Sequence, residues 1–248
     1  MLSRITMNFS NKESTKVWVS RLSQCQSPSL LRTYKNLLSA EENVRLNTLV
    51  FERDKRSYLI SRALIRTLLS HHTGIEPSEL KFGTGKYGKP YLTHPKLSSG
   101  SIHFNLSHTA DLAIACVSFG NMVGIDTEAT LGAPPLEIMR EHFTQGEVLE
   151  LMACAPGARF DHFWAVWTLK ECCTKATGIG LSTPLNQLSF SLLRQGEIQL
   201  LTKPVSPFFE KPWWFAQWRP TPNHMAALCL EWDERTEPLV NVYECVVV

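Results

Sequence analysis

The sequence predicts an α+β protein built from two similar halves, because the same order of features occurs twice along the chain. The first repeated feature is a helix start. Ser39 precedes Glu42, and Thr144 precedes Glu147, by three residues in each case. In such a capping box, the hydroxyl and the carboxylate satisfy free N–H groups at the beginning of a helix.

A longer helical pattern follows each capping box, over about residues 54–71 and 161–176. Both patterns end at the tripeptide Thr-Gly-Ile, at residues 73–75 and 177–179. Glycine at this place favours a left-handed residue that closes the helix. The two halves therefore share the end of their long helix as well as the start of the helix before it.

The third repeated feature is an apolar strand pattern, at residues 112–117 and again at residues 225–230. Each feature is common on its own, so coincidence is the alternative, but the shared order favours a duplication. We therefore expect a pseudo-twofold pair of α/β halves, residues 1–121 and 122–248. We expect the active site at their junction, because clefts between similar units often bind ligands.

The composition is that of a folded protein with nearly balanced charge. Of the 248 residues, 44% are hydrophobic, which is enough to bury a core, and the formal net charge is only +2. A nucleic-acid binder usually has a stronger basic bias. We see neither a run of about 18 apolar residues nor a secretory signal, so we expect no membrane span and a cytoplasmic protein. The seven cysteines form no CxxC pair, and we expect buried free thiols.

Two acids follow the first apolar strand pattern. Residues 112–119 and 122–128 are predicted to form a hairpin around a Gly-Asn turn. Asp126 and Glu128 are separated by one residue on the return strand, so their side chains share a face. Burying two carboxylates is costly, and a divalent cation is the simplest compensation. The alternative is an exposed strand end with two solvated acids.

One stripe of the second long helix combines aromatic residues with a Glu–Lys pair. Phe163, Trp167, Glu171 and Lys175 follow one another at four-residue spacing. Because an aromatic stripe faces a core or a cleft, Glu171 would be partly desolvated. Desolvation raises a carboxyl pKa and suits a metal ligand or a general base. The alternative is an ordinary solvated pair, which contributes only about 0.3–0.5 kcal/mol.

Several segments of the first half suit phosphate groups. Residues 86–90, Lys-Tyr-Gly-Lys-Pro, form a basic turn whose glycine lets the backbone approach a ligand. Residues 104–108, Phe-Asn-Leu-Ser-His, end in a pair that could donate hydrogen bonds to phosphate oxygens. Positive charge is concentrated on the first long helix at Arg53, Lys55, Arg56, Arg62 and Arg66. A solvated helix face is the alternative for this basic group.

Four motifs in this order resemble the Sfp-type 4′-phosphopantetheinyl transferases. They are Gly88-Lys89-Pro90, Phe104 to His108, Gly124 to Glu128, and Trp167 to Leu181. The similarity spans about residues 39–185. It implies a pseudo-twofold α+β fold with coenzyme A held between the halves. The first half would contact the phosphates and adenine of coenzyme A, and the second would provide the magnesium and catalytic residues.

The resemblance also implies roles for single residues. Asp126, Glu128 and Glu171 resemble the magnesium ligands. Glu171 is also the candidate base, and Lys175 would lie beside the reacting phosphate. The residues expected around the phosphates and adenine of coenzyme A are Lys89, Pro90, Ser107 and His108. For the 3′-phosphate we favour Arg56, although a shift of one residue in the alignment would put Ser57 there.

The implied reaction transfers the 4′-phosphopantetheine group of coenzyme A to a serine of an acyl- or peptidyl-carrier protein. It would use Mg²⁺ and release adenosine 3′,5′-bisphosphate. We expect a monomer that binds neither nucleic acid nor membrane. One alternative is a metal-dependent nuclease, but Thr130 and Cys173 stand where its signature lysine would follow an acid by two residues. Another alternative is a non-catalytic module that binds coenzyme A or a carrier, which would not need all three acids.

Overall fold

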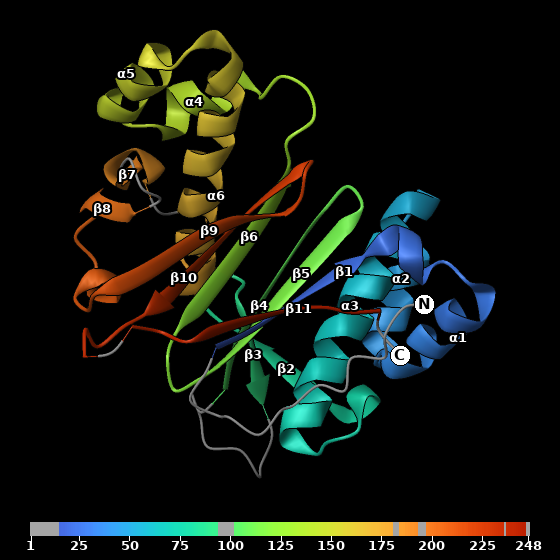
Figure 1. Ribbon diagram of the computed structural model, residues 1–248. Coiled ribbons are helices and arrows are strands. Elements are labelled where there is room, and N and C mark those ends of the chain that lie inside the picture. The colour runs from blue at the N-terminus through green and yellow to red at the C-terminus, as the bar shows by residue number, and fades with distance from the viewer. Residues whose placement is uncertain (1–14, 94–101, 181–183, 193–196, 236, 247–248) are drawn as a thin grey trace. The chain divides into compact units, whose positions relative to one another are not determined.

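The computed structural model divides by packing into two compact units (Figure 1). Unit 1 comprises Met1–Gly83, Pro90–Gly120 and Pro238–Val248, and unit 2 comprises Thr84–Lys89 and Asn121–Glu237. The structure describes residues 15–93, 102–180, 184–192, 197–235 and 237–246. Residues 1–14, where a secretory signal would begin, lie outside these ranges. Leu181, the last residue of the fourth sequence motif, also lies outside them.

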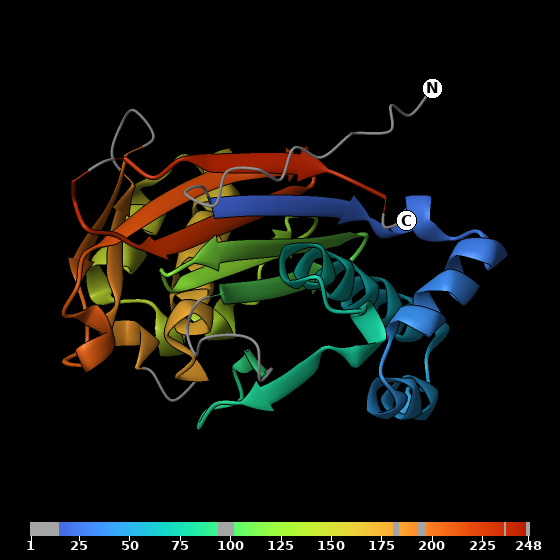
Figure 2. The same ribbon diagram turned by 90° about the horizontal axis from the view of Figure 1, so that it is seen from below.

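Unit 1 is built around a four-stranded sheet and a long helix. Its strands are β1 (Thr15–Arg21), β2 (Lys81–Thr84), β3 (Pro90–Thr93), β4 (Ile102–Thr109), β5 (Leu112–Phe119) and β11 (Val240–Glu244). Its α-helices are α1 (Pro28–Leu37), α2 (Ala40–Thr48) and α3 (Glu52–Thr73). The sheet order is β11-β1-β5-β4, and β2 pairs with β3. Helix α3 packs along this sheet over a core that includes Trp18, Leu64 and Ala115 (Figure 2).

Unit 2 has the same plan without the added edge strand. Its strands are β6 (Val123–Ala129), β7 (Ser189–Leu192), β8 (Ile198–Thr202), β9 (Trp213–Thr221) and β10 (His224–Glu231). Its α-helices are α4 (Leu136–His142), α5 (Gln145–Ala153) and α6 (Arg159–Thr177). The sheet order is β6-β10-β9, and β7 pairs with β8. Helix α6 packs on β6 and β10 over a core that includes Phe163, Val166 and Ala227.

The duplication predicted from the sequence is confirmed at the level of elements. The order β1-β5-β4 in unit 1 corresponds to β6-β10-β9 in unit 2, with a central strand antiparallel to both neighbours. Both predicted capping boxes form, at the starts of α2 and α5. The long helices α3 and α6 both end at a left-handed glycine with φ of 70°, Gly74 and Gly178.

A buried ion pair is repeated in the two units. In unit 1, Arg66 of α3 donates to the capping-box carboxylate of Glu42 and lies 1% exposed. In unit 2, Lys170 of α6 pairs with the capping-box carboxylate of Glu147. Each cation stands eight residues before the glycine that ends its helix. The assignment of Arg66 to a phosphate-facing or solvated basic surface was therefore wrong, because its guanidinium is enclosed by this pair.

The predicted hairpin of residues 112–128 was also wrong, although both strands exist. Strand β5 has β1 on one side and β4 on the other, so both of its edges are occupied. Strand β6 pairs with β10, which follows it by about a hundred residues. Gly120 adopts a positive φ of 81° and turns the chain, but it links β5 of one sheet to β6 of another. A turn signature predicts a reversal of the chain and leaves the pairing partner open.

The cysteines are free thiols within the described ranges, as expected. Cys25, Cys116, Cys172, Cys173 and Cys229 are buried, and Cys154 and Cys245 are partly exposed. Among the described helices, none combines the length and the apolar character that crossing a bilayer requires.

Candidate active site

The two acids of β6 lie on the face of the strand that contacts α6. Gly124, Asp126 and Glu128 alternate along β6, so all three share that face. A Cβ atom on Gly124 would lie 2.0 Å from the carbonyl oxygen of Cys172 and 2.5 Å from the Ala176 nitrogen. The missing side chain therefore lets β6 approach α6 closely, and this approach brings the following acids to the helix.

Helix α6 presents the aromatic and charged stripe to these acids. The Trp167 Nε1–H donates to Glu128 Oε1 at 3.4 Å. The Lys175 ammonium lies 2.5 Å from Asp126 Oδ1, and the Asp126 side chain is only 3% exposed. Between them, Glu171 Oε1 is buried and accepts no hydrogen bond from the described residues. Unit 2 therefore gathers three carboxylates and one ammonium between one strand and one helix.

Burial and mutual repulsion raise the pKa of two of these carboxyls. Desolvation raises the pKa of Glu128 to about 7, and the nearby Asp126 charge adds to the effect. Desolvation and Asp126 also raise the pKa of Glu171, while Lys175 opposes the rise. Burial disfavours the Lys175 ammonium, but its ion pair with Asp126 outweighs burial and raises the pKa of the lysine. Several shifted pKa values in one cluster are typical of functional sites.

The three acids do not form a ready-made metal site in this arrangement. In the described part of the chain, no group of three or more His, Cys, Asp or Glu side chains is arranged to hold a metal ion. Lys175 forms its ion pair with Asp126, and the buried Oε1 of Glu171 accepts no hydrogen bond from the described residues. The donor set nevertheless suits a hard divalent cation, which takes carboxylate oxygens. The metal role of the three acids stays a prediction.

The raised pKa of Glu128 predicts how the stability of the metal-free protein depends on pH. Between the usual value of 4.5 and the folded value of about 7, the folded state binds more protons than the unfolded state. The stability contribution of Glu128 is therefore favourable at low pH and is lost as pH rises through about 7. With EDTA present, Glu128→Gln should remove this part of the dependence. Thermal unfolding of the wild type and of Glu128→Gln between pH 5 and pH 8 measures this difference in pH dependence. Identical profiles of Tm against pH would contradict the prediction.

In unit 1, the predicted contacts to coenzyme A lie on β4, α3 and β3. His108 is exposed, and its Nδ1 lies 3.1 Å from the Ser57 hydroxyl. Ser107 is 5% exposed and occupies the opposite face of β4, because adjacent strand residues alternate. Arg56 is exposed at the start of α3, and Pro90 begins β3. The structure thus brings Ser57 and His108 together, and it separates the side chains of Ser107 and His108.

Lys89 belongs to unit 2 by packing and is engaged with its backbone. Its ammonium donates to the carbonyl oxygens of Val123 at 3.1 Å and Ala176 at 2.6 Å. The first of these begins β6 and the second lies in the last turn of α6, where a cation is favoured. A Cβ atom on Gly178 would lie 2.9 Å from Lys89 Cβ, so the side chain packs closely on the helix end. Lys89 therefore ties the two elements that carry the acids.

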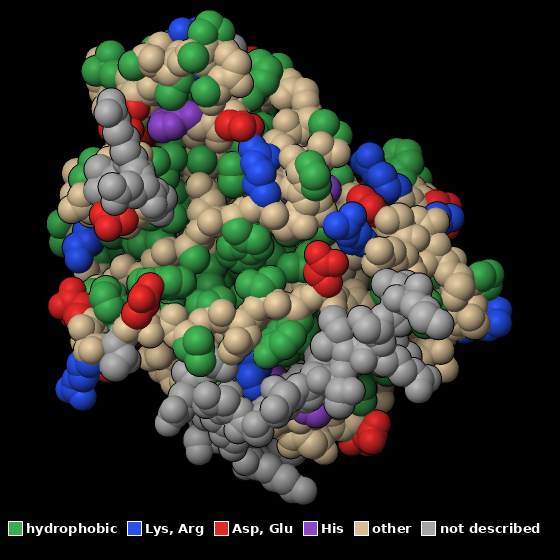
Figure 3. Space-filling model, in the orientation of Figure 1, with side chains coloured by type: hydrophobic (Ala, Val, Ile, Leu, Met, Phe, Trp, Pro, Cys, Tyr) green, Lys and Arg blue, Asp and Glu red, His purple; other side chains and the backbone are tan. Residues whose placement is uncertain are grey.

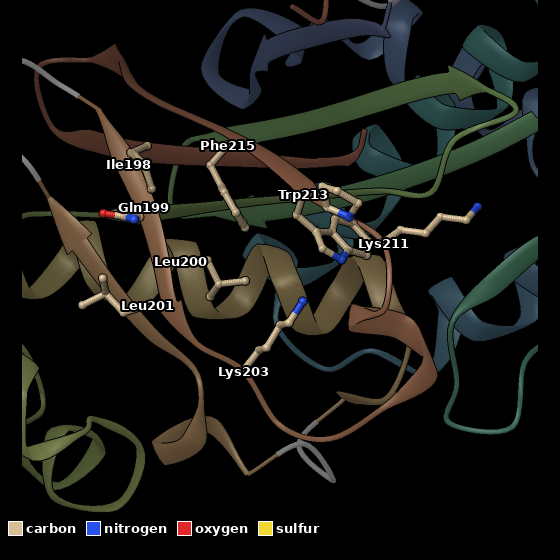
Figure 4. A pocket seen from close by; sticks show the side chains of 9 residues that line it. Ile198, Gln199, Leu200, Leu201, Lys203, Lys211, Trp213 and Phe215 are labelled. Carbon is tan, nitrogen blue, oxygen red and sulfur yellow. The ribbon is translucent and has the colours of Figure 1, made fainter. Parts of the chain in front are cut away.

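A separate cavity of about 290 Å³ lies between β8 and β9 (Figure 4). Its apolar wall includes Ile198, Leu200, Trp213 and Phe215, and hydrophobic side chains gather around this hollow in the space-filling view (Figure 3). Lys203 and Lys211 also line it, but Lys203 donates to the Phe209 carbonyl and Lys211 pairs with Glu231. The cavity shares no residue with the acid and lysine cluster.

Comparison with known proteins assigns the chain to a class. The model of "4′-phosphopantetheinyl transferase, N-terminal" matches residues 26–119, and that of the "4′-phosphopantetheinyl transferase superfamily" matches residues 122–229. The 4′-phosphopantetheinyl transferase HetI of Nostoc sp. is 31% identical over 198 residues, which cover 79% of this chain and 83% of HetI. Sfp of Bacillus subtilis is 27% identical over 84% of this chain and 89% of Sfp. These matches define a phosphopantetheinyl transferase.

The chain belongs to the 4′-phosphopantetheinyl transferase superfamily, and the resemblance to its Sfp-type members is confirmed. The expectation of a transferase enzyme is confirmed with it. Among solved structures, holo-[acyl-carrier-protein] synthase of Thermotoga maritima is 20% identical, with a TM-score of 0.37. This match covers 44% of the present chain and 61% of the synthase. Such a similarity is too low to support an argument about the site.

Proposed function

We propose that the protein transfers the 4′-phosphopantetheine group of coenzyme A to a serine hydroxyl of an apo acyl- or peptidyl-carrier protein. The reaction would require Mg²⁺ and release adenosine 3′,5′-bisphosphate. The cluster of Asp126, Glu128, Glu171 and Lys175 in a chain of this family carries the proposal. We further propose that the enzyme is a cytoplasmic monomer, since its duplication provides two related units in one chain.

Asp126, Glu128 and Glu171 would hold the cation. Their fit rests on the carboxylate donor set, on the buried Glu171 Oε1 that accepts no hydrogen bond from the described residues, and on raised pKa values that a bound cation would lower. When bound, Mg²⁺ would neutralise charge on the pyrophosphate oxygens of coenzyme A. In that state Asp126 would no longer depend on Lys175 for its counter-charge. The ammonium would then be available to donate to a phosphate oxygen.

Glu171 is the proposed general base. Burial raises its pKa and so opposes the lowering that a bound cation would cause, which would help the ionised carboxylate to accept a proton. The serine oxygen would attack the β-phosphorus, and its proton would pass to Glu171 directly or through water. The bond from the β-phosphorus to the bridging oxygen would break, and the leaving group would be adenosine 3′,5′-bisphosphate. The charge that develops on that group would be stabilised by Lys175.

Residues of unit 1, together with Lys89 of unit 2, are proposed to contact the phosphates and adenine of coenzyme A. His108 and Ser57 form one hydrogen-bonded group on an accessible face, which would donate to a phosphate. Arg56 would supply positive charge near the 3′-phosphate. The remaining proposed contacts are Lys89, Pro90 and Ser107. The backbone bonds of Lys89 suggest that its ammonium also supports the site from unit 2.

The first test is direct. The protein, coenzyme A, Mg²⁺ and an apo-carrier protein are combined, and the carrier is weighed by mass spectrometry. We expect the carrier to gain the mass of one phosphopantetheine group, and EDTA in excess of Mg²⁺ should abolish the gain. An unchanged carrier mass with several acyl- and peptidyl-carriers would contradict the proposed reaction. Binding of coenzyme A without transfer would favour the non-catalytic alternative.

The unit 1 contacts predict a change in substrate affinity. Ser57→Ala or His108→Ala should raise the KM for coenzyme A about tenfold while kcat changes little, because each removes one hydrogen bond to a charged phosphate. Steady-state kinetics with the carrier at saturation would measure both constants. Ser78→Ala, at an exposed residue of the same unit, is the matched control. An unchanged KM in both site variants would remove this group from the proposed contacts.

A further inference from the structure

A buried ion pair lies directly beside the candidate base on α6. Lys170 precedes Glu171 and is fully buried. Its Nζ lies 2.8 Å from Glu147 Oε2 and 2.8 Å from the carbonyl oxygen of Leu185, and it also donates to the Leu188 carbonyl. An ammonium has three donors, so these three bonds use them all. Lys170 has none left for a substrate.

The carboxylate of Glu147 is equally committed. It is 1% exposed, and Oε2 accepts hydrogen bonds from the Thr144 N–H at 2.8 Å and the Thr144 hydroxyl at 3.1 Å. Its Oε1 accepts from the Phe190 N–H at 3.1 Å. The pair thus joins α6 to the start of α5, to β7 and to the turn at Leu185–Gln187. Rotation of α6 about its axis would break bonds to all of these segments.

We propose that the Glu147–Lys170 pair positions Glu171 for the proposed reaction. Consecutive helical residues point about 100° apart. Fixing Lys170 in the core therefore fixes the direction of Glu171 toward the face that contacts β6. A misplacement of about 1 Å in a catalytic group costs up to roughly a hundredfold in rate. Lys170 and Glu147 are positioning residues in this proposal, whose catalytic consequence rests on the proposed function.

Unit 1 contains the same pair without a catalytic acid. Arg66 donates to Glu42 at 2.5 Å, and to the carbonyl oxygens of Pro77 and Leu80. As in unit 2, these carbonyls belong to the first residue of a 3-10 turn and to the residue that follows it. The residue after Arg66 is Thr67, where unit 2 has Glu171. The pair in unit 1 therefore provides a control with the same chemistry and the same place in its unit.

The test compares two double variants that remove one pair each. The first is Lys170→Met with Glu147→Gln, and the matched control is Arg66→Met with Glu42→Gln. Replacing both partners avoids leaving one buried charge uncompensated. Circular dichroism and Tm report whether each variant is folded. Steady-state kinetics give kcat and the KM for coenzyme A. The Kd for Mn²⁺ is measured with coenzyme A present, from the electron paramagnetic resonance of free Mn²⁺. Wild-type transfer is measured first, since its absence would reject the proposed function and not this inference.

We expect the unit 2 variant to fold, to lose kcat by roughly 10- to 100-fold, and to bind Mn²⁺ more weakly. The unit 1 variant should keep kcat and Mn²⁺ affinity within about twofold, even with a similar loss of Tm, and any change should appear in KM. Equal losses of kcat in both variants, or a normal kcat in a folded unit 2 variant, would overturn the proposal. If the unit 2 variant does not fold, Lys170→Met alone replaces it, because Glu147 then keeps both carboxylate oxygens as acceptors for the Thr144 and Phe190 N–H groups. Wild-type kcat and Mn²⁺ affinity in that variant would also overturn the proposal.

Discussion

Replacing any one of Asp126, Glu128 and Glu171 by its amide should reduce phosphopantetheine transfer by at least about a hundredfold. Each amide keeps the size of the side chain but removes a negative charge that the proposed cation requires. Glu171→Gln also removes the proposed base. The rate is measured as the mass gain of an apo-carrier under saturating coenzyme A and Mg²⁺.

The folded state should survive these changes. Burial and repulsion from Asp126 disfavour the charged forms of Glu128 and Glu171, so their amides should leave the Tm at pH 7 unchanged or raise it. Asp126→Asn should lower the Tm, because Lys175 then lacks its ion-pair partner in a largely buried place. Glu210→Gln, at an exposed residue of the same unit, is the matched control. Near-normal transfer by any of the three amide variants would contradict the assignment of the cluster.

The duplication was predictable because its signals are local. A capping box depends on two residues three apart, and the glycine that ends a long helix depends on one residue with a positive φ. Ser39, Thr144, Gly74 and Gly178 therefore behave as their sequence contexts indicate. The stripe of α6 was also predictable, because helical periodicity alone places Trp167, Glu171 and Lys175 on one face.

What the sequence left open depends on contacts between distant segments. The partner of β6 is β10, and no turn signature encodes a pairing across about a hundred residues. Arg66 reads as a surface cation in isolation, and only the packing of α2 against α3 reveals its buried carboxylate. The alternation along β6 predicts a common face for Asp126 and Glu128. The hydrogen bond from Lys175 to Asp126 could not be predicted in this way, because it depends on how α6 packs against β6. Ser57 next to His108 is likewise a contact between a helix and a strand.

Gly124→Ala should disable the enzyme although residue 124 has no side chain and takes no part in the proposed chemistry. The added Cβ would meet the Cys172 carbonyl at 2.0 Å and the Ala176 nitrogen at 2.5 Å, and both are backbone atoms of a packed helix. Relief of this overlap requires β6 and α6 to separate, at a cost of about 3 kcal/mol. For a chain of this size that cost lowers Tm by roughly 6–12 °C.

The same separation would move Asp126 and Glu128 away from Glu171 and Lys175, since all four depend on the approach of β6 to α6. We therefore expect transfer by Gly124→Ala to fall by roughly a hundredfold at temperatures where the variant remains folded by circular dichroism. Gly157→Ala is the matched control, because Gly157 is exposed and an added Cβ would meet no atom within 4 Å. Its Tm and its rate should stay close to those of the wild type. A folded Gly124→Ala variant with a normal rate would mean that the acids and the lysine act without the close contact between strand and helix, and the geometry of the site would need another explanation.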